Sequence, residues 1–161
     1  MVRKATAALP GLQAVPGAGA QRIGGAMNAP VSKETTHALL RVTAGLMLWQ
    51  HGAQKLLGMF GRDAVGSWFD WPAGIAGLIE FFLPILIILG IRTRWVAFIL
   101  TGHFAVVYWW RHFFAREMEF WPIVNGGELA ILYCAIFLYL WTTGSGKFSL
   151  DHMVPGPGGD N

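Results

Sequence analysis

The residues of this sequence that could do chemistry are ionisable side chains inside long apolar segments. His51 and Lys55 lie in the first segment, Glu80 in the second and His103 in the third, and Glu128 lies near the start of a fourth. A charge near the centre of a membrane helix costs roughly 2.5–3.5 kcal/mol, so such residues are rare and mark a site. Two carboxylates beside an imidazole and an ammonium either exchange protons with a polar ligand or neutralise one another.

The spacing in the first segment indicates how these residues are positioned. At about 100° per residue, Arg41, His51 and Lys55 share one sector of a helix with Gly45 and Gly52. Glycines on a helix face let a second helix approach closely. We therefore expect this polar face to look inward at other helices.

Depth along the segments brings the polar residues to similar heights. With a rise of about 1.5 Å per residue, the depths from the side of the termini are ~20 Å for His51 and Glu80, ~22 Å for Glu128, ~25 Å for Lys55 and ~14 Å for His103. The sequence thus predicts one polar pocket, in which Glu80, Glu128 and His51 handle protons and Arg41, Lys55, His103 and Asn125 contact a ligand.

The composition predicts an all-α, integral-membrane four-helix bundle. The chain of 161 residues is 54% hydrophobic and only 13% charged, against about 25% charged in soluble domains. We expect membrane-spanning helices at about 37–57, 73–89, 95–114 and 122–141 within a domain 36–146, between a flexible tail 1–35 and a tail 147–161. Met27 is a second candidate start, and an N-terminal peptide beginning at Met27 or Asn28 would indicate that residues 1–26 are not native.

The basic residues are scattered around the apolar segments, which indicates topology rather than nucleic-acid binding. Four crossings place both termini on one side of the lipid bilayer. That side would carry Lys33, Arg92, Arg94, Lys147 and the basic residues of the tail, and the other side Arg62, Arg111 and Arg116. By the positive-inside rule, both termini lie in the cytoplasm.

Other interpretations of the polar residues stay open. They could form a structural network that only holds an assembly subunit together, or line a path for protons or small solutes. A haem b between His51 and His103 would need facing sectors, which the spacing does not establish. We predict no metal site, because no helix carries a Glu-x-x-His pair and Cys134 is the single cysteine.

The order of these motifs resembles the DoxX family over residues 38–151. The resemblance rests on Arg41, Gly45, His51-Gly52 and Lys55-Leu56, then Gly77, Glu80, Pro84, Leu89-Gly90 and Thr93-Arg94, then Asn125-Gly126-Gly127-Glu128-Leu129, Gly144 and Phe148-Ser149-Leu150-Asp151. It implies a four-helix protein of the bacterial or archaeal inner membrane whose relatives include subunits of quinol and thiosulfate:quinone oxidoreductases. It also implies functional positions at Arg41, His51, Lys55, Glu80, Asn125 and Glu128.

Together these observations predict a redox-associated accessory subunit that binds a quinone or a similar small ligand in its polar pocket. The chain would serve a quinone-linked oxidoreductase and would not be a stand-alone enzyme. We expect its partners to be the lipid bilayer and a membrane or soluble redox protein, and not nucleic acid.

Overall fold

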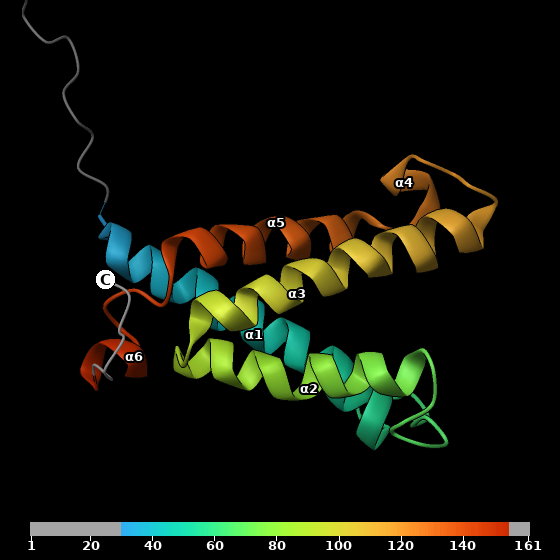
Figure 1. The fold of residues 1–161 in the computed structure, drawn as a ribbon, viewed down its shortest axis with the longest axis horizontal. Helices are drawn as coiled ribbons and strands as arrows, with labels where there is room; N and C mark the ends of the chain where they lie inside the picture. The colour runs from blue at the N-terminus through green and yellow to red at the C-terminus, as the bar shows by residue number, and fades with distance from the viewer. Residues whose placement is uncertain (1–29, 155–161) are drawn as a thin grey trace, which may run out of the picture. The chain divides into compact units, whose positions relative to one another are not determined.

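The computed structural model describes residues 30–154, which Figure 1 shows in colour. Residues 1–29 and 155–161 lie outside the described residues, and with them most of the predicted tail 1–35 and the end of the predicted tail 147–161. The chain divides into two units, Met1–Pro30 and Val31–Asn161, and every helix that the structure describes belongs to the second.

The described residues form helices and loops and no strand, so the fold class is all-α as predicted. In chain order the elements are α1 Lys33–Leu57, α2 Ala73–Leu89, α3 Thr93–Val107, the π-helix η1 Tyr108–Phe113, the 3₁₀ turn η2 Phe114–Arg116, α4 Pro122–Asn125, α5 Glu128–Thr143 and α6 Leu150–Met153. None of the described helices combines the length and the apolar composition of a membrane span.

Helix boundaries follow local capping chemistry. The hydroxyl of Ser32 accepts a hydrogen bond from the backbone N–H of Thr35 at 3.1 Å, which satisfies one of the free donors at a helix start. As a result α1 begins four residues before the segment 37–57 and takes in residues assigned to the tail. Helix α2 has the bounds 73–89 that the sequence indicates.

The fourth apolar segment is broken rather than continuous. Gly126 adopts a left-handed conformation with φ of 72°, which ends the single turn α4, and α5 starts afresh at Glu128. The sequence predicted one helix over 122–141, whereas the structure has α4 and α5 on either side of Gly126-Gly127.

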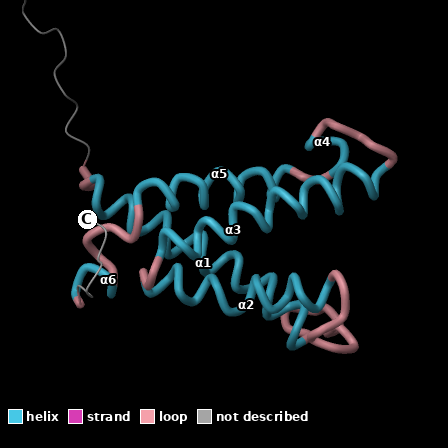
Figure 2. Tube along the Cα trace, viewed as in Figure 1, coloured by secondary structure: helices cyan, strands magenta, loops and turns pink. Residues whose placement is uncertain are grey.

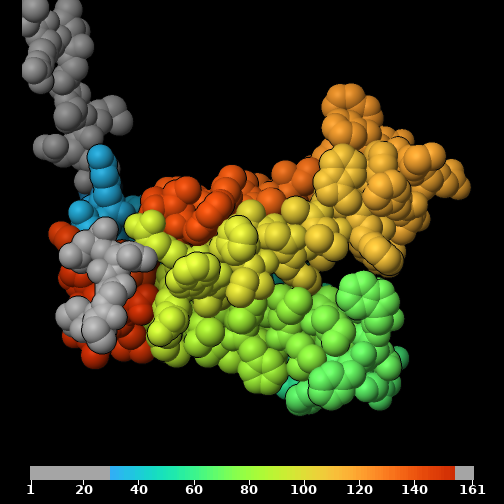
Figure 3. All heavy atoms as spheres, viewed as in Figure 1, coloured from blue at the N-terminus to red at the C-terminus, as the bar shows by residue number. Residues whose placement is uncertain are grey.

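Two helical hairpins make up the described unit. Helices α1 and α2 pack along their length, as do α3 and α5, whereas the contacts of α2 with α3 and of α1 with α5 are smaller. Figures 1 and 2 show the α3–α5 pair lying over the α1–α2 pair. Figure 3 shows the hairpins diverging toward the end of α3 that continues into η1. At that end the ring of Trp71, in the loop before α2, still contacts the ring of Trp110 edge to face, with centroids 5.9 Å apart.

Close backbone approach defines the α1–α2 hairpin. A Cβ atom at Gly52 would lie 2.4 Å from the backbone nitrogen of Phe81 and 2.6 Å from the carbonyl oxygen of Glu80. The contact therefore requires glycine, and it brings the face of α1 that carries Lys55 against the turn of α2 that carries Glu80.

The α3–α5 hairpin has an aromatic core. The rings of Phe104 and Tyr133 stack with centroids 4.8 Å apart, and Tyr133 stacks in turn on Phe137 at 5.9 Å. Leu48 of α1 and Ile87 of α2 are fully buried in the same apolar cluster. The core thus joins both hairpins beside the polar residues of α1 and α2.

We expect Gly52→Ala to destabilise the fold by about 1–3 kcal/mol, because α1 and α2 must separate to admit the methyl group. The matched control is Gly102→Ala in α3, where an added Cβ meets no atom within 4 Å and should stabilise the helix by about 0.5–1 kcal/mol. Thermal unfolding followed by circular dichroism measures both changes. Equal melting temperatures for the two variants would contradict the close contact.

Candidate functional site

The carboxylate of Glu80 is the centre of the polar cluster. It is buried on α2, and its two oxygens have different partners. The ammonium of Lys55 on α1 forms an ion pair with Oε2, and His103 Nε2 on α3 lies 3.1 Å from Oε1. The structure therefore brings together three of the predicted site residues, one from each of three helices.

The partners of Glu80 indicate the protonation pattern of the cluster. A carboxylate with a donor at each oxygen is an acceptor at both positions, so His103 donates its Nε2–H and Lys55 one of its three N–H groups. A buried charge is tolerated when it is paired and hydrogen-bonded in this way. Lys55 keeps part of its side chain exposed, which leaves N–H groups for another acceptor.

A cavity of about 180 Å³ lies against this cluster. Its polar lining consists of His51, Lys55, Glu80, His112 and Tyr133, and the rest comes from apolar side chains of α1, α3 and α5 and from Gly126. The edge of the half-buried His51 ring faces the ring of Tyr133, with centroids 6.4 Å apart. The cavity is smaller than the ~300–1,000 Å³ pockets that enclose drug-sized ligands, so its size suits a single small ring or a few water molecules.

Tyr133 is a cavity residue that sequence reasoning missed. Its side chain is buried, at 4% exposure, and its hydroxyl has no hydrogen-bond partner within the described residues. Buried hydroxyls are nearly always hydrogen-bonded, so this group needs a partner from the cavity. The signal in the sequence was the spacing of Ala130, Tyr133 and Phe137, which places the tyrosine on the inward stripe of α5.

Asn125 acts on the cavity indirectly. Its amide donates to the carbonyl of Glu119 at 2.8 Å, and its Oδ1 accepts from the backbone N–H of Gly127 at 2.7 Å. The backbone carbonyl of Asn125 accepts from Nδ1 of His112 at 3.1 Å. Asn125 therefore shapes the α4–α5 turn and holds His112, a second cavity residue that sequence reasoning missed.

Glu128 does not join the cluster, contrary to expectation. It is exposed in the first turn of α5 and does not line the cavity. On a helix it lies about 140° around the axis from Tyr133, so both cannot face inward. Because α5 begins at Glu128, the residue instead places its charge beside the positive end of the helix dipole.

Arg41 also lies apart from the cavity, in a structural position near the other end of α1. Its side chain is 1% exposed, and its guanidinium donates to the carbonyls of Ile87 at 2.6 Å, Ile88 at 2.9 Å and Phe148. Nearby, the carbonyl of Gly90 accepts from the backbone N–H of Asp151 at 3.1 Å. Arg41 thus ties the segment before α6 to the end of α2.

The sequence predicted no metal site and left open a haem b between His51 and His103. Over residues 30–154, no three side chains of His, Cys, Asp or Glu gather as a metal site. The Nε2 atom of His103 is engaged by Glu80, so only its Nδ1 atom is left as an axial ligand to a haem shared with His51.

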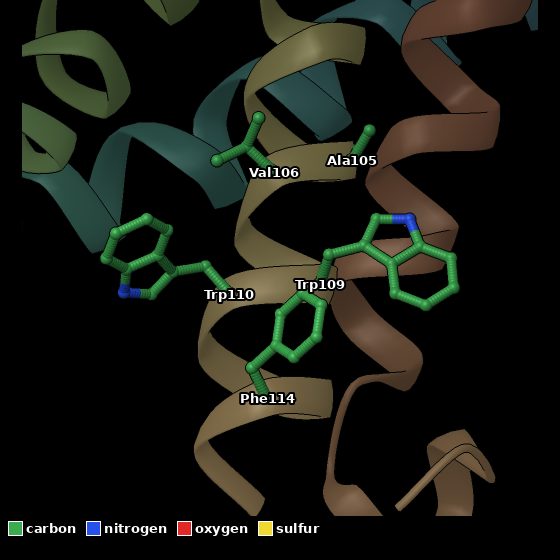
Figure 4. Close-up of a pocket in the computed structure, with 5 residues that line it drawn as sticks. All are labelled: Ala105, Val106, Trp109, Trp110 and Phe114. Atoms are coloured by element: carbon green, nitrogen blue, oxygen red, sulfur yellow. The ribbon is translucent and has the colours of Figure 1, made fainter. Parts of the chain in front are cut away.

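A second hollow of about 220 Å³ lies on the outer side of α3 and η1. Figure 4 shows the side chains that line it, Ala105, Val106, Trp109, Trp110 and Phe114. All five are apolar or aromatic, and none carries a titratable group. The hollow shares no lining residue with the polar cavity, so it has no part in the chemistry of Glu80.

Comparisons with known proteins support a single family. The DoxX family model matches residues 36–113. An uncharacterized protein of Haemophilus influenzae is 41% identical over 120 residues, which cover 71% of this chain and 87% of that protein. No solved structure matches this chain. The family match includes Lys55, Glu80 and His103 and ends at Phe113, one residue after His112.

Glu80→Gln should destabilise the fold by about 1–3 kcal/mol, because it leaves Lys55 without its carboxylate. The loss stays below that of a fully buried pair, since the Lys55 side chain is partly exposed. Glu128→Gln is the matched control and should cost under about 1 kcal/mol. Urea unfolding of both variants provides the measurement, and a larger loss for Glu128→Gln would overturn the assignment of Glu80 as the central charge.

Arg41→Lys should destabilise the chain by at least about 2 kcal/mol, because a lysine cannot serve the three carbonyls in the same geometry. Tryptic cleavage after the exposed Lys147 should then become faster, as Phe148 loses its donor. Arg62→Lys, in the exposed loop after α1, is the control. An unchanged cleavage rate in Arg41→Lys would show that the guanidinium does not hold this segment.

Proposed function

Given that the chain belongs to the DoxX family, we propose that it is an integral-membrane accessory subunit of a redox system that binds a quinone head group in the cavity beside Glu80. The observation that carries this proposal is the buried Glu80 carboxylate, paired with Lys55 and His103, at a small cavity that Tyr133 also lines with a hydroxyl that has no partner within the described residues.

The chemistry of the cavity suits a ring that bears oxygen atoms. A carbonyl oxygen accepts hydrogen bonds, and the free N–H groups of Lys55 and the hydroxyl of Tyr133 are available donors. Phe104 and Leu48 supply apolar walls for the ring. Such a mixture of apolar walls and a few converging polar groups is typical of small-molecule sites.

The size and placement of the cavity support binding of a head group rather than a whole lipid. About 180 Å³ holds a single ring, so a long side chain would remain outside. Leu129 and Gly126 at the cavity are exposed, which provides an opening to the surrounding medium. In a membrane that medium is the hydrocarbon interior, where the isoprenoid chain of a quinone dissolves.

The exposed surface supports insertion into a bacterial or archaeal inner membrane. Large apolar side chains are exposed along the outer faces of the long helices, among them Phe82 on α2, Phe98 on α3 and Leu132 on α5. Soluble monomers rarely expose apolar patches above a few hundred Å². Within these helices Lys55 and His103 are instead directed to Glu80.

The distribution of basic residues supports a topology with both termini in the cytoplasm. Lys147 lies 3.9 Å from Glu34 in the first turn of α1, and Arg94 approaches Gly144. Lys33, Arg94 and Lys147 therefore gather at one end of the bundle, where the positive-inside rule places the cytoplasm. Electron transfer would fall to a membrane or soluble redox partner, with this chain holding the quinone.

Lys55→Met should weaken quinone binding about tenfold or more, because it removes a charged donor from the cavity. The probe is a benzoquinone with a ten-carbon side chain, titrated calorimetrically into the protein in detergent. Lys33→Met in the exposed first turn of α1 is the matched control and should bind as the wild type does.

Extraction of lipids from the purified protein tests the same proposal independently, since a bound quinone should co-purify. Absence of both a co-purified quinone and saturable binding would reject the proposal. A loss of thermal stability in Lys55→Met with no ligand binding in either protein would instead favour a purely architectural subunit.

A further inference from the structure

The π-helix η1 places His112 against the cavity with a defined hydrogen-bonding pattern. A π-helical turn within a helix is rare and often occurs at functional sites. Here it follows α3 directly and carries His112 to the turn between α4 and α5. Nδ1 of His112 lies 3.1 Å from the backbone carbonyl of Asn125, which accepts hydrogen bonds and cannot donate one.

This contact determines which atom His112 offers to a ligand. Because Nδ1 must carry the proton that it donates to the carbonyl, the neutral imidazole has a bare Nε2. The Asn125 side chain is itself held by Glu119 and Gly127, so the carbonyl has little freedom to release His112. His112 therefore presents an acceptor, and no donor, to the cavity that it lines.

Tyr133 presents the complementary group. Its buried hydroxyl has no partner within the described residues and can both donate and accept a hydrogen bond. The oxygens of Glu80 already have Lys55 and His103 as donors. Half-buried His51, which also lines the cavity, has no such fixed partner among residues 30–154 and can take either role. An incoming ring is thus met by an acceptor at His112, a hydroxyl at Tyr133 and the free N–H groups of Lys55, which can donate to an oxygen of either redox form.

We propose that this cavity binds the hydroxyl-bearing, reduced form of its ring ligand in preference to the oxidised form. The inference rests on the proposed function and assigns the preferred redox state of the ligand. A hydroquinone donates one O–H to Nε2 of His112 and accepts from Tyr133. A quinone has only acceptor oxygens, which leaves the lone pair of Nε2 facing another lone pair. Leaving a buried acceptor unsatisfied weakens binding more than a lost contact alone.

Calorimetric titration under anaerobic conditions tests the preference directly. The probes are a benzoquinone with a ten-carbon side chain and its hydroquinone. We expect wild-type protein to bind the hydroquinone about tenfold more tightly than the quinone. Saturable binding of the quinone with equal or higher affinity would overturn this inference while leaving the proposed function in place. Binding of neither form would reject both.

Substitutions at His112 and Tyr133 assign the preference to its residues. His112→Asn keeps a side-chain donor for the Asn125 carbonyl but removes the Nε2 acceptor, so the two forms should bind within about twofold of each other. Tyr133→Phe should weaken both forms, because the hydroxyl can donate to either. A preference that survives in His112→Asn would overturn the role of His112.

Matched controls separate these effects from general loss of structure. His152→Asn in exposed α6 and Tyr139→Phe at the opposite end of α5 alter residues outside the cavity. Both controls should keep the wild-type affinities for the two forms. Thermal unfolding of each variant verifies the fold, and an equal change of preference in His152→Asn would also contradict the assignment.

Discussion

The Glu80 carboxylate joins three helices through hydrogen bonds that apolar packing alone would not specify. Lys55 of α1 and His103 of α3 each occupy one of its oxygens. Removing any one of the three would leave a buried polar group without its partner, and such a loss costs more than the pair contributes when intact. The cluster therefore sets the relative placement of the two hairpins, because His103 belongs to one and the Lys55–Glu80 pair to the other. The cavity depends on that placement.

Small and aromatic residues have different roles in the packing around the cluster. Gly52 lets the backbones of α1 and α2 touch beside Glu80, which shortens the reach that Lys55 needs. The stacked rings of Phe104, Tyr133 and Phe137 give the opposite wall its rigidity. Phe104 and Tyr133 of this aromatic stack line the cavity together with Lys55 and Glu80. The orphaned hydroxyl of Tyr133 is a consequence of this arrangement.

The polar groups at the two ends of the bundle have different kinds of partners. At the end near α6, Arg41 gathers carbonyls from the end of α2 and from the segment before α6, which is a structural use of a buried charge. Toward the other end, the π-helix and the break at Gly126 interrupt regular helix and free backbone groups for other partners. One of them, the carbonyl of Asn125, fixes the orientation of His112. Regular helix at this end would leave His112 without that anchor.

The sequence by itself determined the all-α class and the inward face of α1, because ionisable residues at helical spacing in apolar segments must face other polar groups. The order of its motifs also determined the family. The sequence also placed Lys55, Glu80 and His103 at similar depths, and in the structure Lys55 and His103 both contact Glu80. Only the tertiary structure decided that Glu128 points outward, because the packing of α5 buries the face that carries Tyr133, about 140° around the helix from Glu128. It also decided that Arg41 binds carbonyls and that His112 and Tyr133 line the cavity. Helical periodicity gives a residue's direction within one element, whereas contacts between elements depend on breaks, rotations and backbone partners that no single segment encodes.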